Sequence, residues 1–179
     1  MPITPDTKDW TWVLERACPE CGLDVRALSR QQLVAMLRDN AVTWAELLHD
    51  THVRRRPSDD VWSALEYGCH VRDVYRLFDQ RLQLMLDQEH PTFANWDQDE
   101  TAVQERYDQQ DPKVVAQELR SAAETLGGRF AALSEHQWGR TGARTDGARF
   151  TVDSFGRYLL HDIVHHVDDV RRGFAHLGG

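Results

Sequence analysis

The chain has 179 residues, three cysteines and a formal net charge of −8, which comes from 29 acidic and 21 basic side chains. This acidic balance argues against a nucleic-acid or anionic-membrane partner, because phosphate binding requires a basic face, and no apolar run approaches the roughly 20 residues of a membrane span. The cysteines are too few for a disulfide framework and the N-terminus lacks a signal peptide, so we expect one soluble, cytoplasmic chain.

Residues 1–28 are predicted to form a short irregular arm before a helical domain at residues 29–179. The arm contains Cys18-Pro-Glu-Cys21-Gly, which has the shape of a zinc knuckle, a turn that aims two thiolates at one metal. A structural zinc needs four ligands, however, the sequence offers no second knuckle, and Cys69 alone cannot complete the set. We therefore rank a plain turn first, a redox-active Cys-x-x-Cys pair second and a metal knuckle third.

Helical spacing of apolar residues predicts two helices in the first half of the chain. The first begins at Ser29, whose hydroxyl and Gln32 form the capping-box pattern. The second begins near Ser58 and runs to about Gln88, and a polar stretch at 89–110 then reads as a long connection.

Two further helices are predicted in the second half. Asp111 and Pro112 are typical of a cap followed by proline in the first helical turn. Residues 137–150, rich in glycine and arginine, are predicted to be a loop, and Thr151 caps the last helix, which ends near Gly173 or Gly178.

These elements together predict an all-α fold. No segment between the helices shows the alternation of a buried strand. Four helices with one long link indicate a four-helix bundle, and the link is long enough to return along a helix. The second and third helices can therefore run parallel, with one long crossover between them.

Three histidines are candidates for metal ligands. His161 and His165 are four residues apart, so they share one face of the last helix and can converge on one ion, whereas Asp162 and His166 point elsewhere by about 100°. On the second helix, His70 occupies an otherwise apolar face and needs a polar partner there.

With this helix order, the long middle connection, His70 on the second helix and the His161-x-x-x-His165 pair on the fourth, the sequence resembles the DinB/YfiT-like superfamily of metalloenzymes from Ser29 to about Gly173. The resemblance implies that His70, His161 and His165 bind a divalent metal, zinc or nickel, with water in open positions. It also implies a link to low-molecular-weight thiols, because characterised relatives include mycothiol-dependent maleylpyruvate isomerase and bacillithiol or mycothiol S-transferases. Such a metal can hold a cofactor thiol as its reactive thiolate.

Two carboxylates lie one helical turn from these histidines. Glu66 precedes His70 and Asp169 follows His165, so each could orient an imidazole or be a solvated surface charge. We predict a thiol-dependent S-transferase or isomerase that acts on an electrophilic small molecule. The alternative is a non-catalytic metal- or ligand-binding bundle, in which an outer helix face could form a homodimer. A catalytic site should keep an open position and a cleft, whereas a structural site should be closed by a fourth protein ligand.

Overall fold

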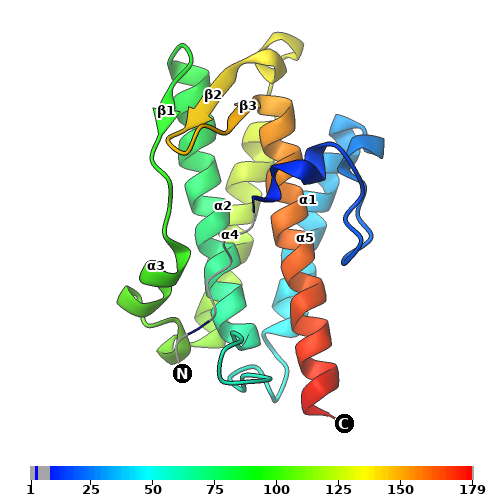
Figure 1. Ribbon diagram of the computed structural model, residues 1–179, viewed down its shortest axis with the longest axis vertical. Helices are drawn as coiled ribbons and strands as arrows, with labels where there is room; N and C mark the ends of the chain where they lie inside the picture. The colour runs from blue at the N-terminus through cyan, green and yellow to red at the C-terminus, as the bar shows by residue number, and fades with distance from the viewer. Residues whose placement is uncertain (1–2, 4–8, 179) are drawn as a thin grey trace.

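The computed structural model describes residue 3 and residues 9–178. Four long helices pack side by side. The colour gradient along the chain shows that α2 and α4 run in one direction and that α1 and α5 run in the opposite direction (Figure 1). Each of α1 and α2 contacts both α4 and α5. The predicted four-helix bundle with one crossover between its second and third helices is therefore confirmed. These helices are α1 (Arg30–Leu47), α2 (Ala64–Asp87), α4 (Pro112–Ala131) and α5 (Val152–Leu177).

Local caps explain where the helices begin. Ser29 and Thr151 cap α1 and α5 with complete capping boxes, as predicted. The predicted start of the second helix near Ser58 was wrong, because the cap is Ser63. Its hydroxyl accepts a hydrogen bond from the Glu66 backbone N–H at 3.3 Å, and the Glu66 carboxylate accepts one from the Ser63 N–H at 2.8 Å.

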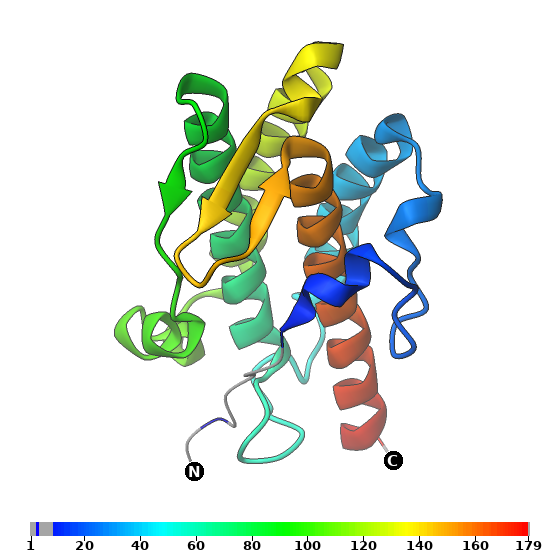
Figure 2. The same ribbon diagram turned by 45° about the horizontal axis from the view of Figure 1, so that its top comes forward.

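The connections contain more regular structure than the sequence predicted. The crossover includes a short helix and a strand, and the segment predicted as a loop at 137–150 contains a hairpin that completes a three-stranded sheet across one end of the bundle (Figure 2). Strands of two to four residues are too short to show alternation in a sequence. The elements are β1 (Thr92–Phe93), α3 (Gln98–Gln104), β2 (Thr141–Arg144) and β3 (Arg149–Thr151), with β1 parallel and β3 antiparallel to β2.

The core is apolar, but α2 and α5 also bury polar side chains. Apolar packing includes the stacked rings of Phe78 and Phe155, whose centroids lie 4.4 Å apart. Burial of a polar side chain destabilises the fold unless its polar atoms have partners. Most of the described buried polar residues lie on these two helices, namely Glu66, His70, Arg72, Arg81, His161 and His165.

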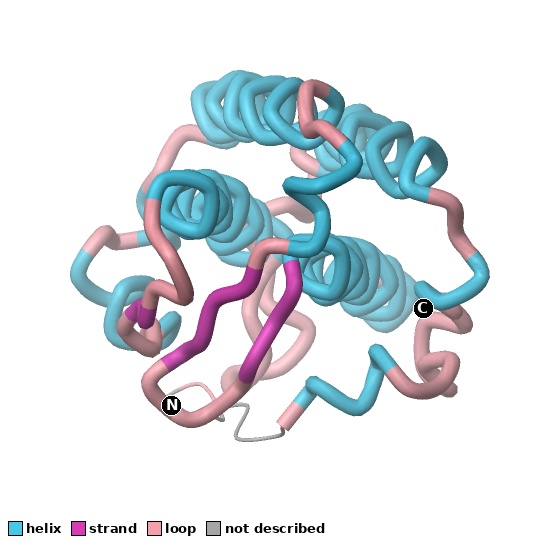
Figure 3. The backbone as a smooth tube through the Cα atoms, turned by 90° about the horizontal axis from the view of Figure 1, so that it is seen from above, coloured by secondary structure: helices cyan, strands magenta, loops and turns pink. Residues whose placement is uncertain are grey.

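The N-terminal arm lies along α5. Its two short 3-10 helices, Trp10–Leu14 and Val25–Ala27, both contact α5 (Figure 3). Arg157 of α5 donates a hydrogen bond of 3.0 Å to the Leu28 carbonyl at the end of the arm. Among the helices of the described residues, none combines the length and the apolar character that crossing a membrane requires.

Candidate metal centres

Two groups of ligand-type side chains occur in the described part of the chain, and the ligand atoms of each lie within 4.8 Å of one another. The inner group consists of His70, Asp162 and His166. The outer group consists of Cys18, Cys21, His161 and His165. The structure therefore divides the predicted ligand set: His161 and His165 come together, but His70 lies with Asp162 and His166. The reason is the helical rotation of about 100° per residue, which turns Asp162 and His166, rather than their neighbours, towards α2.

The inner group contains buried polar atoms that lack partners. Both ring nitrogens of His70 and Oδ2 of Asp162 have no hydrogen-bond partner among the described residues, and His70 is 1% exposed. His70 Nε2 lies 3.7 Å from Asp162 Oδ2, and His166 Nε2 lies 3.7 Å from Asp162 Oδ1. These distances are too long for hydrogen bonds and are near those between two ligands of one ion. The arrangement therefore fits an ion between the three side chains.

Asp169 fixes the orientation of His166. Its Oδ2 lies 2.9 Å from His166 Nδ1, so that nitrogen carries the proton and donates a hydrogen bond to the carboxylate. The lone pair of His166 is then on Nε2, which faces Asp162. The orienting role considered for Asp169 therefore applies to His166 rather than to His165. Asp169 Oδ1 lies 3.8 Å from His165 Nε2, which is too long for a hydrogen bond.

Glu66 has a different role from the predicted one. Its carboxylate caps α2 through Ser63 and accepts a hydrogen bond of 3.0 Å from Arg56. No hydrogen bond joins it to His70, whose two nitrogens are unpartnered in the described structure. The third position of a capping box turns this side chain back towards the helix start, away from the following turn.

Aromatic rings enclose His70. The ring of Trp96, from the crossover, stacks on the imidazole with a centroid distance of 5.4 Å and an interplanar angle of 4°. Trp62 approaches to 5.3 Å and His166 to 4.9 Å. These contacts join segments that are distant in sequence, so periodicity along one helix could not indicate them.

The charge states of the inner group suit a divalent cation. Burial lowers the pKa of His70, so its imidazole is neutral at pH 7. Burial alone would raise the pKa of Asp162, but the nearby His166 and His70 outweigh it and hold the pKa at about 2. Two imidazoles and one carboxylate are a donor set that zinc, nickel and iron all accept.

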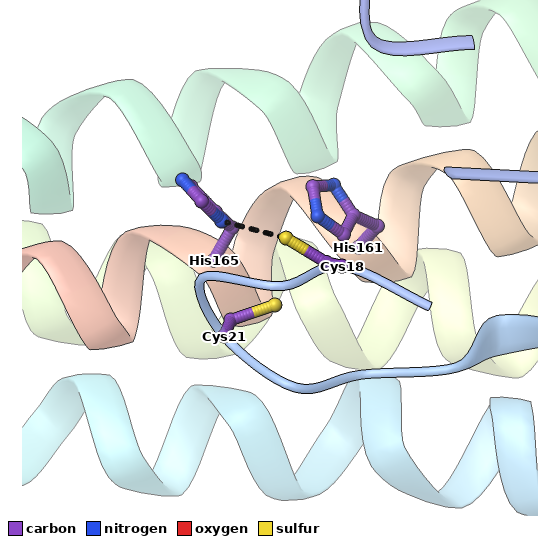
Figure 4. Close-up of side chains that lie close together, drawn as sticks. All are labelled: Cys18, Cys21, His161 and His165. Atoms are coloured by element: carbon purple, nitrogen blue, oxygen red, sulfur yellow. Dashed lines mark hydrogen bonds between the residues drawn. The ribbon is translucent and has the colours of Figure 1, made fainter. Parts of the chain in front are cut away.

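The outer group joins the arm to α5. Cys18 Sγ lies 3.7 Å from His165 Nδ1, and the two thiols approach the two imidazoles from the arm (Figure 4). Cys18 is 1% exposed and His161 3% exposed, and His161 Nε2 has no hydrogen-bond partner in the described structure. Burial, with the nearby His165, lowers the pKa of His161 to about 4.

A tight turn presents the two cysteines. The Gly22 N–H donates to the Cys18 carbonyl at 2.9 Å, and the Cys18 N–H donates to the Leu23 carbonyl at 3.0 Å. Gly22 has a φ of +75°, a left-handed conformation that favours glycine. The predicted turn is therefore present, while the redox and metal hypotheses stay predictions. Cys69 is separate from both groups and packs in the core, as expected.

A cleft of about 1240 Å³ runs beside both groups. Its walls come from the arm, the segment before α2, the first turn of α2, the crossover, the tip of the β2–β3 hairpin and α5. Tyr158 and Arg144 meet in one wall, where the guanidinium lies 3.4 Å from the phenol oxygen. The lining is acidic, with Arg144 as the single arginine among its described residues. Its carboxylates are Asp9, Glu20, Asp60, Asp97, Asp99, Asp146, Asp162 and Asp169.

Comparisons with known proteins agree with this architecture. The family model of the DinB superfamily matches residues 32–169, which is most of the chain. Among solved structures, YfiT from Bacillus subtilis, described as a probable metal-dependent hydrolase with an unusual four-helix bundle topology, superposes with a TM-score of 0.76. That match covers 85% of this chain and 91% of YfiT, and at 18% sequence identity it shows the fold. No curated protein gives a significant match.

Proposed function

This chain belongs to the DinB superfamily, and we propose that it is a divalent-metal enzyme whose metal is held by His70, Asp162 and His166. The observation that supports this proposal is the convergence of the unpartnered buried atoms of His70 and Asp162 with His166 Nε2 beside a cleft of about 1240 Å³. Three protein ligands leave coordination positions for water or substrate, as catalytic sites require. Of the three ligands expected from the sequence, this set keeps His70 and replaces His161 and His165 with Asp162 and His166.

We propose zinc or nickel as the metal. A metal ion in this group would supply a thiolate or hydroxide nucleophile at neutral pH by lowering the pKa of a thiol or water that reaches it. The chain itself orients the site, because Asp169 holds the Nδ1 proton of His166 and so keeps Nε2 as the donor. Trp62 and Trp96 cover the ring of His70 and exclude water from that side.

For the reaction, we propose a thiol-dependent S-transferase or isomerase with a mycothiol-like cosubstrate and an electrophilic small molecule as substrate. The cleft volume of about 1240 Å³ exceeds the roughly 300–1,000 Å³ that is typical for one ligand, so two reactants fit. Its many carboxylates can accept hydrogen bonds from a hydroxyl-rich thiol and would repel an anionic substrate. A cytoplasmic location, where such thiols stay reduced, belongs to the same proposal.

Hydrolysis is the second candidate, and the described activity of YfiT favours it. The same three ligands would then present water, instead of a thiol, to a substrate in the cleft. The two reactions differ in one requirement, because only the transferase or isomerase depends on an added low-molecular-weight thiol.

The test uses full-length protein purified without a histidine tag or thiol reductant. Elemental analysis of the parent is compared with His70→Ala and Asp162→Asn, and with Asp168→Asn as a control on the same helix outside both groups. We expect each inner-group variant to lose about one equivalent of metal and the control to lose none. Unchanged metal content in both inner-group variants would contradict the proposal.

Activity assays then separate the candidates. Electrophilic substrates are offered with and without mycothiol, and ester and amide substrates are offered without it. Turnover that requires the thiol supports the transferase or isomerase, and turnover without it supports the hydrolase. A metal-loaded protein whose cobalt spectrum is unchanged by added thiol or azide would favour the non-catalytic metal-binding bundle. The homodimer stays a prediction, which light scattering in solution can check.

A further inference from the structure

We propose that the outer group, formed by Cys18, Cys21, His161 and His165, is a second metal site that holds a structural zinc ion and fastens the N-terminal arm to α5. This site is separate from the inner group and does not depend on the proposed function. Each of its four side chains offers one ligand atom, and these atoms lie within 4.8 Å of one another.

The donor set and its spacing fit zinc. Two thiolates and two imidazoles in tetrahedral order are a common structural zinc site. With Zn–S bonds of about 2.3 Å and Zn–N bonds of about 2.0 Å, neighbouring ligand atoms in such a site lie about 3.4–3.8 Å apart. The distance from Cys18 Sγ to His165 Nδ1 is 3.7 Å, within this range. Four protein ligands fill a tetrahedral ion, so the site would be closed to substrates.

Burial supplies an independent reason for a ligand. Cys18, His161 and His165 are 1%, 3% and 6% exposed, and His161 Nε2 has no hydrogen-bond partner within the described structure. A buried imidazole nitrogen without a partner destabilises the fold unless an ion or water satisfies it. A disulfide between Cys18 and Cys21 would not satisfy it, because such a bond leaves both imidazoles as they are.

The surroundings of His165 also favour metal binding. Its Nδ1 faces Cys18, while its Nε2 faces two carboxylates, Glu20 Oε2 at 3.6 Å and Asp169 Oδ1 at 3.8 Å. Histidines that bind a metal through one nitrogen commonly direct the other N–H towards a carboxylate, which orients the ring. His165 has this arrangement, with Nδ1 as its metal-binding nitrogen.

The proposed zinc would build one wall of the cleft. Trp10 rests on both outer imidazoles, with ring centroids 4.9 Å from His165 and 5.4 Å from His161. Trp10 also lines the cleft together with its neighbours Asp9 and Thr11. An arm held by zinc would keep these residues in place, whereas an arm without zinc would depend on fewer contacts. The outer group would thus support the inner group through the cleft wall.

The experiment determines the coordination of the metal in full-length protein that is purified without a tag and kept reduced with a non-thiol phosphine. X-ray absorption at the zinc edge of the parent is expected to show sulfur ligands at about 2.3 Å, and that of His70→Ala, which lacks an inner-group ligand, a shell with two sulfur and two nitrogen ligands at about 2.3 Å and about 2.0 Å. Cobalt substitution is expected to give thiolate-to-cobalt charge-transfer absorption. This absorption should weaken in Cys18→Ser, which leaves one thiolate, disappear in Cys18→Ser/Cys21→Ser, and persist in Cys69→Ala, a matched control at a buried cysteine outside the site.

Two results would overturn the proposal. One is a metal shell without sulfur in the parent protein, which needs no variant to fold. The other is a Cys18–Cys21 disulfide in protein isolated under thiol trapping, with no sulfur-bound metal after reduction and zinc addition. The inner group contains no sulfur, so absence of the charge-transfer band from the parent counts against this proposal alone, whereas unchanged metal content in both His70→Ala and Asp162→Asn counts against the proposed function alone.

Discussion

The inner and outer groups take their ligands from the same two turns of α5, yet their surroundings differ. The inner group adds a buried histidine from α2 to a carboxylate and an imidazole, and it faces a cleft. The outer group adds two thiols from the arm to two imidazoles and has four ligands. A shift of one residue along α5, from His161 to Asp162, would therefore separate a site of the closed, structural type, as proposed for the outer group, from one of the open, catalytic type, as proposed for the inner group. The arm supplies thiols to one face of α5 and α2 supplies an imidazole to the other, so the two groups contain different ligand types.

The largest expected effect is that of replacing His70, which should impair metal binding at the inner group and leave the outer group intact. Replacing it with alanine removes one of three inner ligands, so we expect the affinity of that site for metal to fall by more than about 100-fold, since changes outside the ligands already cost 10- to 100-fold. Turnover should fall to background, while sulfur-bound metal is retained. Metal titration of His70→Ala, with the exposed His136→Ala as control, checks this. Equal loss at both groups would show that they are not independent.

Acid should destabilise the metal-free protein through the outer group. His161 has its pKa lowered from 6.5 to about 4, so between these values the unfolded chain binds a proton that the folded chain does not. The free energy of unfolding therefore falls as the pH drops from 6.5 to 4, by about 3 kcal/mol in total, and this contribution is constant below pH 4.

Denaturant unfolding in the presence of a chelator, repeated across this pH range, measures the effect. His161→Gln should flatten the dependence, whereas the exposed His49→Gln should leave it unchanged. A parent protein with the same slope as His161→Gln would show that this imidazole is already protonated, or equally solvated, in the folded state.

A smaller effect is expected at Asp169, whose carboxylate orients His166. In Asp169→Asn the amide oxygen can still accept the hydrogen bond, but the negative charge is lost, so we expect metal affinity at the inner group to fall by about 10-fold. Competition with a chromophoric chelator measures this change, and Asp168→Asn provides the matched control. An unchanged affinity would mean that packing alone holds the ring of His166.

The sequence predicted what depends on local chemistry. Ser29 and Thr151 cap helices through side-chain contacts three residues away, and both starts are confirmed by the structure. The resemblance carried by the histidine pair also led to the correct bundle and superfamily. Both successes rest on patterns within one helix or in the order of the helices.

The sequence could not predict which face of α5 meets which partner. Two i, i+4 pairs overlap there, and only packing shows that Asp162 and His166, rather than His161 and His165, turn towards His70. The sequence did contain one signal for His166 as a ligand. Asp169 follows His166 by three residues, a spacing at which its carboxylate can orient the imidazole. The contact of Cys18 with His165 spans 147 residues, so no local pattern connects the Cys18–Cys21 turn with this histidine.

The smallest expected effect tests Glu66, for which the sequence left open an orienting role at His70 or a solvated surface charge, and whose carboxylate caps the start of α2 in the structure. Because its carboxylate caps the helix and bonds to Arg56, Glu66→Gln should lower the free energy of unfolding by about 1–2 kcal/mol. Metal content and metal affinity at both groups should stay unchanged, since no hydrogen bond joins Glu66 to His70 in the described structure. Denaturant unfolding and metal titration of the same samples check both parts. A stability loss without a metal effect places Glu66 in the scaffold that both groups share, whereas reduced inner-group affinity at unchanged stability would return it to the site.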